Sequence, residues 1–236
     1  MRIKEKRQYF NENFFESIDS EIKAYLLGFL FADGYVNIRR NNTSYRFGVE
    51  VSEKDNNILY LFIQYIYPYS NICIRKPRTR KGFMCARQNY IEMHSTKLVK
   101  DLIKNGCIEN KSTKQLSIPK MEYHLIKHFI RGYFDGDGCA YIRNNIVEFS
   151  ITSKTYNLLN EFKNYFNENG IEIHLNYQKT EDKYTLKTTN KHFTPKIYRL
   201  LYNDANFYFK RKFKKMNIVK QYRDKSYSNI YDHRNA

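Results

Sequence analysis

Apolar side chains recur at every second position in two neighbouring segments of the first half of the chain. Val36 and Ile38 alternate with polar neighbours, and after Asn41 and Asn42 the same alternation continues through residues 45–52. A period of two indicates β-strands with one buried face and one polar face, and the asparagine pair suits a turn between them. The two segments therefore predict an antiparallel hairpin that covers a core on one side.

Helical spacing of apolar residues flanks this hairpin on both sides. An apolar run begins after Asp19 and Ser20, which both suit a helix N-cap, and helical patterns follow the hairpin over residues 53–67 and 96–106. The last pattern ends at Gly106, a residue type that commonly terminates helices. Between these two helices the pattern predicts a second strand pair. Its connecting loop is basic and contains Arg78, Arg80 and Lys81.

The same order of elements is repeated in the second half. Two alternating segments follow another apolar helix, and a helix that ends at Gly170, a second strand pair and a last helix complete the repeat. Pro119 marks the join, because proline interrupts helices. The pattern predicts an α+β protein of two similar αββαββα repeats. From N- to C-terminus we expect a basic extension, the first repeat, the second repeat and a basic tail, at residues 1–20, 21–118, 119–220 and 221–236.

The helices that open the two repeats share a motif. Residues 26–34 read LLGFLFADG and residues 130–138 read IRGYFDGDG, so that small residues stand four apart in both and Asp-Gly ends both. Small residues at this spacing share one helix face and let two backbones approach closely. We therefore expect the two helices to pack against each other, each ended by a glycine in the left-handed conformation. The expected interface residues are Gly28, Ala32, Gly132 and Gly136.

Contact between these helices would place Asp33 and Asp137 side by side. Two carboxylates at the negative ends of two helix dipoles repel each other unless a cation lies between them. A single Asp-Gly after an apolar run is ordinarily a helix stop, but two copies in the same register favour a shared function. The motif therefore predicts a site for divalent metal ions at Asp33 and Asp137, with backbone ligands near Ala32 and Gly136.

The chain of 236 residues has a formal net charge of +17 and a sequence pI of about 9.6. A surplus of this size, spread over the predicted helices and strands, favours a polyanionic partner, and nucleic acid is the first expectation. The cysteines lack the spacing of zinc ligands and are typical of a reducing compartment. The N-terminus is charged and apolar runs are short, so we expect a soluble, non-secreted protein of the cytoplasm or an organellar matrix.

The paired motifs and the repeated order of elements extend over about residues 20–220 and resemble the LAGLIDADG homing endonucleases in their single-chain, two-repeat form. The resemblance implies two saddle-shaped antiparallel sheets that straddle a DNA duplex, packed through the two motif helices. It also implies a monomer with internal pseudo-two-fold symmetry, in which Asp33 and Asp137 bind Mg²⁺ or Mn²⁺ and each half cuts one DNA strand.

Members of this family use a basic residue in each half beside the metal site. In the first half the corresponding segment indicates Lys111, with Lys114 as the reserve. In the second half it indicates Lys210, with Arg211 or Lys212 as alternatives. A cation at this place would stabilise the negative charge that builds on the phosphate during cleavage.

The polar faces of the predicted strands are the expected DNA-binding surface. A two-stranded ribbon fits the major groove, where arginine can bind guanine through two hydrogen bonds. Phosphate contacts would supply much of the affinity and make it fall steeply with salt. The candidates on the strands and on the basic loop are Arg39, Arg46, Arg75, Arg78, Arg80, Arg87, Arg143, Lys183 and Lys187.

Three functions stay open on these grounds. The first is a site-specific, Mg²⁺-dependent endonuclease that cleaves both strands of a long asymmetric DNA target. The second is a splicing cofactor, or maturase, that binds intron RNA on the same basic surface. The third is a DNA-binding regulator of this fold without cleavage activity. The presence of both Asp33 and Asp137 speaks against the third, whereas the basic surface does not separate the first from the second.

Overall fold

The computed structural model describes residues 9–39, 41, 43–80, 83–111, 114–143 and 146–218. Its contacts divide the chain into two compact units. Unit 1 consists of Met1–Lys111 with Pro119–Gly136, and unit 2 consists of Ser112–Ile118 with Asp137–Ala236. The helix that opens the second repeat therefore packs as part of unit 1 up to Gly136, so the compact units and the sequence repeats have different boundaries.

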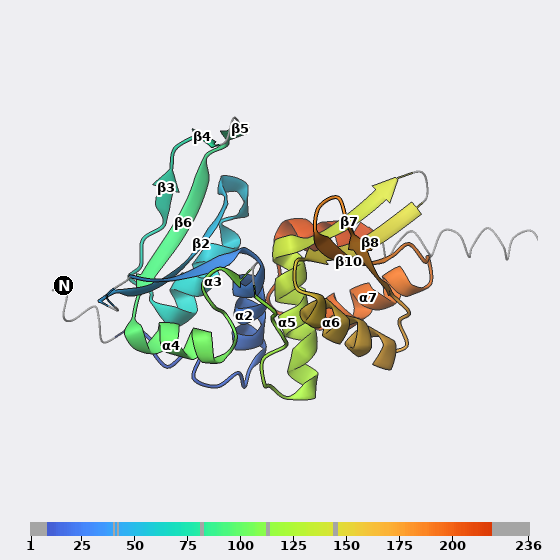
Figure 1. The fold of residues 1–236 in the computed structure, drawn as a ribbon, viewed down its shortest axis with the longest axis horizontal. Coiled ribbons are helices and arrows are strands. Elements are labelled where there is room, and N and C mark those ends of the chain that lie inside the picture. Colours follow the sequence, from blue (N-terminus) through green and yellow to red (C-terminus); the bar gives the residue numbers. More distant parts are fainter. Residues whose placement is uncertain are drawn as a thin grey trace, which may run out of the picture. The chain divides into compact units, whose positions relative to one another are not determined.

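Unit 1 contains a four-stranded antiparallel sheet in the order β1-β2-β6-β3 (Figure 1). Its strands are β1 (Gly34–Ile38), β2 (Tyr45–Ser52), β6 (Gln88–His94) and β3 (Cys73–Arg75). In the predicted hairpin, Val36 of β1 pairs with Phe47 of β2, which in turn pairs with Met93 of β6. All three side chains are buried. This row confirms that the alternating apolar positions form the core face of the sheet.

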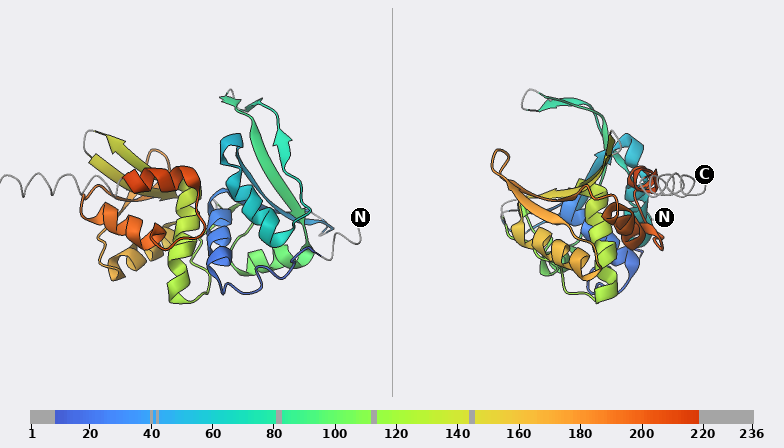
Figure 2. Two further views of the ribbon diagram at one scale, coloured as in Figure 1. Left: turned by 180° about the vertical axis from the view of Figure 1, so that it is seen from behind. Right: turned by 90° about the vertical axis from the view of Figure 1, so that its right-hand side faces the viewer.

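Helices α3 (Asn57–Ile66) and α4 (Thr96–Lys104) lie on one side of this sheet (Figures 1 and 2). The hydroxyl of Ser95 caps α4 by accepting a hydrogen bond from the backbone N–H of Leu98 at 3.2 Å. After α4 the chain turns at Gly106, whose φ of 87° is left-handed, as expected from the sequence. A 3-10 helix, η1 (Glu53–Asp55), connects β2 to α3.

A two-stranded ribbon continues from the far ends of β3 and β6 (Figures 1 and 2). It consists of β4 (Arg78–Arg80) and β5 (Phe83–Cys85), which pair antiparallel with Thr79 opposite Met84. The expectation of a loop at Arg78 and Arg80 is therefore wrong. The sequence offered no alternation of apolar and polar residues at Arg78–Arg80 that would have indicated this strand. Lys81, expected on the same loop, lies outside the described residues.

Two further helices of unit 1, α2 (Glu21–Asp33) and α5 (Tyr123–Asp137), carry the two copies of the motif. They run side by side (Figures 1 and 2), and α5 belongs to unit 1 up to Gly136. Helix α2 is buried on almost all sides, including Leu26 and Leu27. A helix with this burial lies inside a fold and does not form its surface.

Unit 2 contains the second four-stranded antiparallel sheet, in the order β7-β8-β10-β9 (Figure 1). Its strands are β7 (Gly138–Arg143), β8 (Ile146–Ser153), β10 (Lys183–Thr188) and β9 (His174–Gln178). Helices α6 (Tyr156–Glu168) and α7 (Phe193–Tyr202) contact the sheet, and residues 210–218 are also helical. The chain turns after α6 at Gly170, with a φ of 68°.

The order of elements confirms the predicted fold class. Each half has the order helix, two strands, helix, two strands, helix, and each half forms one antiparallel four-stranded sheet. The first half differs by its added β4–β5 ribbon. Within the described ranges, none of the helices has both the length and the apolar character that crossing a membrane requires.

Candidate functional site

Helices α2 and α5 touch through their glycines. A Cβ atom at Gly28 would lie 2.0 Å from the carbonyl oxygen of Phe129, and a Cβ atom at Gly132 would lie 2.0 Å from the carbonyl oxygen of Tyr25. A side-chain carbon cannot approach an oxygen so closely, so only glycine allows these two backbones to meet. The contact is made by the small residues that the motif placed on one helix face.

Each motif helix ends at its aspartate. Asp33 is the last residue of α2 and Asp137 is the last residue of α5, and both side chains are exposed. A Cβ atom at Gly136 would lie 2.4 Å from the Cβ of Ala32 and 3.3 Å from Oδ2 of Asp33. The second motif therefore contacts the C-terminal end of α2 one residue before its own aspartate.

The glycines that follow the two aspartates differ from the expectation. Gly34 has φ −81° and ψ 165°, an extended conformation that any residue adopts. Of the described glycines, Gly106 and Gly170 have positive φ, and Gly138 does not. The left-handed caps expected at Gly34 and Gly138 are therefore wrong. Glycine at position 34 has a steric reason instead, because a Cβ there would lie 2.4 Å from Cδ2 and 2.7 Å from Cα of Leu30.

Lys111 lies at the end of α2, as the sequence suggested. Its Nζ donates hydrogen bonds to the carbonyl oxygens of Leu30 at 2.6 Å and Ala32 at 2.8 Å. The last carbonyls of a helix have no partner within the helix, and a positive charge is favourable at that end of the dipole. Sγ of Cys107 lies 4.0 Å from the carbonyl oxygen of Leu30, and burial raises the pKa of its thiol to about 11. Lys111 therefore brings a positive charge to the helix end that carries Asp33.

In unit 2, Lys212 and not Lys210 is the lysine that bonds to the backbone beside the motif aspartate, as Lys111 does in unit 1. Lys212 is 5% exposed, and its Nζ donates a hydrogen bond to the carbonyl oxygen of Gly138, which directly follows Asp137. Lys210 and Arg211 have exposed side chains. The first choice from the resemblance to the family thus lies two positions away, and Lys212, one of the alternatives, is the lysine bonded to the backbone that follows Asp137.

The helical register explains this displacement. Phe209, Lys212 and Met216 are buried, and their spacing of three and four residues places them on one face of the helix at 210–218 and of the residue that precedes it. Phe209 and Met216 are the signal that could have identified Lys212 from the sequence. Lys114, the reserve in the first half, is exposed.

A buried polar network lies between α2 and α5. The hydroxyl of Tyr25 donates to Oδ2 of Asp135 at 2.9 Å, and Nη2 of Arg131 donates to Oε1 of Glu21 at 2.6 Å. Nη1 of Arg131 also lies 2.8 Å from Nδ1 of His128. Burial raises the pKa of Tyr25 and the nearby Asp135 raises it further, so the phenol stays protonated and donates. Sequence reasoning missed this network, and its signals are Arg131 and Asp135, which stand where the first motif has apolar residues.

The polar face of the first sheet holds Arg46 in place. Its Nη1 lies 3.2 Å from Oε2 of Glu92, and its Nε donates to Oδ1 of Asn37 at 3.1 Å. The hydroxyl of Tyr35 donates to the same Glu92 oxygen at 2.8 Å. Burial opposes the charge of Glu92, but the hydrogen bond from Tyr35 and the charge of Arg46 outweigh it and hold the pKa of Glu92 below its usual value.

Two further arginines near this face also have acidic partners. Nε of Arg75 lies 2.9 Å from Oε1 of Glu50 without the alignment of a hydrogen bond, and its guanidinium carbon lies 4.9 Å from the ring centre of Tyr90. Nη1 of Arg87 lies 3.7 Å from Oε1 of Glu53, beyond the N-terminal end of β6. Three of the predicted DNA-binding arginines are therefore neutralised by glutamates of their own unit.

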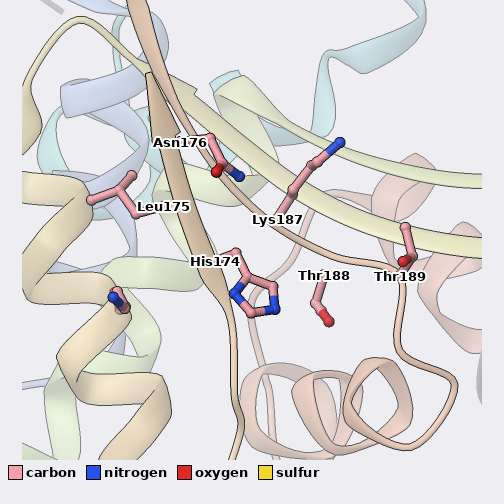
Figure 3. Close-up of a pocket in the computed structure, with 7 residues that line it drawn as sticks. His174, Leu175, Asn176, Lys187, Thr188 and Thr189 are labelled. Carbon is pink, nitrogen blue, oxygen red and sulfur yellow. The ribbon is translucent and has the colours of Figure 1, made fainter. Parts of the chain in front are cut away.

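The remaining predicted DNA-binding residues are exposed, form an ion pair elsewhere or lie outside the description. Arg39, Arg78 and Lys187 have exposed side chains. Figure 3 shows Lys187 of β10 beside His174, its cross-strand partner on β9. Lys183 forms an ion pair with Glu181 at the turn between β9 and β10. The side chains of Arg80 and Arg143 are outside the described part of the chain.

Comparisons with known proteins agree with this geometry. Residues 125–209 match the family model of the LAGLIDADG-like domain. Mesophilic variants of the homing endonuclease I-DmoI are similar in structure, with a TM-score of 0.55 and 17% identity over 78% of this chain and 97% of that chain. The meganuclease I-AabMI, bound to uncleaved DNA, has a TM-score of 0.57 and 14% identity over 86% of this chain and 91% of that chain.

The homing endonuclease I-WcaI, bound to its DNA recognition sequence, has a TM-score of 0.55 and 19% identity over 89% of this chain and 91% of that chain. No curated protein sequence matches this chain. At these identities the likeness to solved structures shows the fold. Residues 125–209 are thus similar to the LAGLIDADG-like domain, and most of the chain has the two-repeat fold seen in the LAGLIDADG homing endonucleases.

Proposed function

We propose that the protein is a site-specific endonuclease that cleaves both strands of a long DNA target, with divalent metal ions at Asp33 and Asp137. The contact between the ends of the motif helices is the observation that carries this proposal. Gly136 contacts Ala32 and Asp33, and Asp137 is the next residue of α5. Both aspartates are exposed, so a substrate phosphate can reach them.

The donor set suits Mg²⁺ or Mn²⁺. These ions prefer oxygen ligands, and Mg²⁺ is commonly bound by one or two carboxylates together with waters and substrate phosphates. Asp33 and Asp137 each supply a carboxylate, and the described residues contain no group of three or more acidic, histidine or cysteine residues that could hold a metal alone. Bound ions would supply Lewis acidity toward the phosphate oxygens. Solved structures of I-DmoI include complexes with DNA and Mn and with target DNA in the presence of Mg.

Lys111 and Lys212 would act at the two helix ends. Each ammonium group is held on backbone carbonyls, at Leu30 and Ala32 in one case and at Gly138 in the other. Because these bonds fix the ammonium groups beside the residues that carry the carboxylates, the positive charge is already in position before substrate arrives. We expect it to stabilise the negative charge that builds on the reacting phosphates.

The polar faces of the two sheets would bind the DNA in this proposal. Arginine and amide groups such as Arg46 and Asn37 can read base edges in the major groove. The net charge of +17 would supply a non-specific attraction to phosphates. A single chain covers nearly the full length of one I-DmoI chain, which supports cleavage by a monomer that contains both repeats.

Cleavage of a selected target tests this function directly. Duplexes that bind the protein with Ca²⁺ can be selected from a randomised library, and the selected sequence can be inserted into a plasmid. We expect one linear product with Mg²⁺ and none with EDTA. Asp33→Asn and Asp137→Asn should each abolish linearisation and keep most of the DNA affinity. Asp19→Asn is the matched control, because it removes the same charge just before the start of α2 and should leave cleavage unchanged.

Two outcomes would contradict the proposal. Tight binding of the selected duplex by folded wild-type protein, with no cleavage in Mg²⁺ or Mn²⁺, would exclude the endonuclease. Full linearisation by both Asp→Asn variants would keep the activity but exclude the proposed metal site. Thermal unfolding of each variant shows whether a loss of cleavage reflects chemistry or a loss of folded protein.

A further inference from the structure

The contacts between α2 and α5 come in related pairs. When Gly28 is aligned with Gly132, each residue of α2 has a counterpart in α5. A Cβ atom at Gly28 would meet the carbonyl oxygen of Phe129, and a Cβ atom at Gly132 would meet that of Tyr25, the counterpart of Phe129. Exchanging the two helices therefore turns one side of their interface into the other. Both helices belong to unit 1 up to Gly136.

One side of this interface is apolar. The rings of Phe31 and Phe129 meet edge to face, with their centres 5.0 Å apart. Leu27 and Leu125 stand one helical turn before these two rings, on the same helix faces, and both are buried. These four residues form the apolar side of the interface.

The other side has polar groups at the counterpart positions. The counterparts of Phe129 and Phe31 are Tyr25 and Asp135. The hydroxyl of Tyr25 donates a hydrogen bond to Oδ2 of Asp135 at 2.9 Å, and both residues are fully buried. Where the apolar side has two phenylalanine rings in contact, this side therefore has a hydrogen bond to a buried carboxylate.

The second pair of counterparts on this side is an ion pair. Glu21 and Arg131 stand where the apolar side has Leu125 and Leu27. Nη2 of Arg131 donates to Oε1 of Glu21 at 2.6 Å, and Nη1 lies 2.8 Å from Nδ1 of His128. The side chain of Arg131 is fully buried, and that of Glu21 is 17% exposed. The polar side of the interface is formed by Glu21, Tyr25, Arg131 and Asp135.

The glycine contacts do not choose between α2 and α5 as partners. Each glycine meets the carbonyl at the equivalent position of the opposite helix. Two copies of α2, or two copies of α5, could therefore approach each other equally closely. The steric fit of the motif thus allows identical helices of two chains to pair.

The polar side does distinguish like from unlike helices. If identical helices packed in this way, each charged group would face an apolar residue in place of its partner. The neighbours would be Arg131 with Leu125, Asp135 with Phe129, and Glu21 with Leu27. A buried charge that loses its partner is strongly destabilising, whereas an ion pair replaced by apolar residues often costs nothing. The arrangement therefore penalises the wrong pairing more than it stabilises the right one.

We propose that the polar side of this interface selects the partner helix, so that α2 pairs with α5 and each of them rejects a second copy of itself. The selection acts when two chains fold close together. Folding during synthesis proceeds from the N-terminus, and α2 precedes α5 in the chain. The α2 helices of neighbouring chains can therefore meet before the α5 helices have been made.

Reversing one charge at a time tests whether Glu21 and Arg131 recognise each other. Glu21→Arg would place two cations together and Arg131→Glu would place two carboxylates together, so each variant should have a lower midpoint of urea denaturation than the wild type. Both substitutions in one chain restore opposite charges and should recover most of the lost stability.

Mixing the two single variants tests the selection itself. The chains carry different dyes, are unfolded in urea and are refolded together in equal amounts. If they exchange α5, the two reversed positions meet in one contact and the native residues meet in the other. We expect most chains to form a dimer with one copy of each variant, detected by light scattering and energy transfer, and a urea midpoint above that of either variant alone. Wild-type chains treated in the same way should stay monomeric.

Glu16→Arg and Lys97→Glu provide the matched control. Nζ of Lys97 lies 3.4 Å from Oε2 of Glu16, and both side chains are exposed and lie outside α2 and α5. A refolded mixture of these two variants should contain monomers. Monomers in the mixture of Glu21→Arg with Arg131→Glu would overturn the proposal if the chain with both reversals folds like the wild type.

Milder variants give an answer if charge reversal prevents folding. Glu21→Gln, Arg131→Gln and the variant with both substitutions form a double-mutant cycle, measured by urea denaturation. Because each single substitution leaves a buried charge without its partner, the double variant should lose clearly less stability than the sum of the two single losses. Additive losses would overturn the recognition between these residues. None of these measurements requires cleavage, so they test helix pairing whether or not the protein is an endonuclease.

Discussion

The two sheets have the same strand topology and different polar faces. In unit 1, Arg46 and Arg75 lie on the sheet within ion pairs with glutamates, and Arg87 beside it has the same kind of partner. In unit 2, Lys187 and His174 stand next to each other without any acidic partner among the described residues. Three arginines of the first unit thus have acidic partners, whereas Lys187 of the second has none among the described residues.

This difference shows which face of a repeat's sheet is restricted in the residues it can carry. The apolar face must fill a core, so Phe47 and Phe149 occupy comparable buried positions in β2 and β8. The polar faces carry no such constraint and have diverged. A guanidinium held by a carboxylate has a fixed orientation, which favours selective contacts with base edges, while unpaired ammonium groups favour phosphates of any sequence.

Removal of the lysines at the helix ends should have the largest effect on the cleavage rate. It also shows whether the two halves use equivalent lysines for cleavage. We expect Lys111→Met and Lys212→Met each to slow cleavage about 100-fold or more, the usual loss when one donor to a developing negative charge is removed. Lys210→Met is the control and should cleave normally. The measurement is the single-turnover cleavage rate with saturating protein. A slow Lys210→Met and a normal Lys212→Met would restore the assignment made from the sequence.

Substitution of the glycines in contact between α2 and α5 should have the next largest effect, a loss of stability. Gly28→Ala or Gly132→Ala would force a Cβ against a backbone carbonyl, and we expect a loss of about 3 kcal/mol in the free energy of unfolding, measured by urea denaturation. Gly170→Asn is the control, because asparagine tolerates the left-handed conformation and no atom lies within 4 Å of a Cβ there. Equal stability of Gly28→Ala and the wild type would contradict the helix contact.

One substitution can release an arginine of the first sheet from its ion pair. Glu92→Gln removes the partner of Arg46, so we expect tighter binding to random-sequence DNA and a slope of log K against log salt that is steeper by about 0.9. Anisotropy titrations in EDTA measure both. A slope equal to that of the wild type would show that Arg46 does not reach a phosphate when released.

The same substitution has a defined effect on the pH dependence of stability. The pKa of Glu92 is lower in the folded protein, so its stabilising contribution is present above its unfolded pKa of about 4.3 and is lost as the pH falls through the folded value. The difference in unfolding free energy between the wild type and Glu92→Gln should therefore shrink below about pH 4.3. A difference that stays constant down to acid pH would contradict the ion pair.

The sequence was sufficient to predict the helices and strands that bury a periodic apolar face. Alternation at Val36 and Ile38 and helical spacing in α3 predicted the first hairpin and its covering helix, since burial imposes both periods. Strand β4 was missed, because no alternation of apolar and polar residues marks Arg78–Arg80. The ion pair between Arg46 and Glu92 joins two strands far apart in the chain, so no local pattern could indicate it.

For the candidate site, the sequence was most informative where steric demands are strict. The glycines of the motif predicted the helix contact, because no other residue fits there. The prediction of left-handed caps at Gly34 and Gly138 was wrong. Glycine is also used where a side chain would clash, as at Gly34, so its presence alone does not indicate a left-handed conformation. Lys212 was ranked below Lys210 because matching a short segment to the family's pattern leaves the helical register undefined by a residue or two, whereas the buried Phe209 and Met216 define it.

Strand-resolved cleavage of the selected duplex, with each strand labelled at its own 5′ end, tests the central proposal most directly. The wild type should cut both strands in Mg²⁺ and neither in EDTA, and Asp33→Asn and Asp137→Asn should each lose double-strand cleavage while binding the duplex. Cutting of both strands at the wild-type rate by either variant would contradict a site built from the two aspartates.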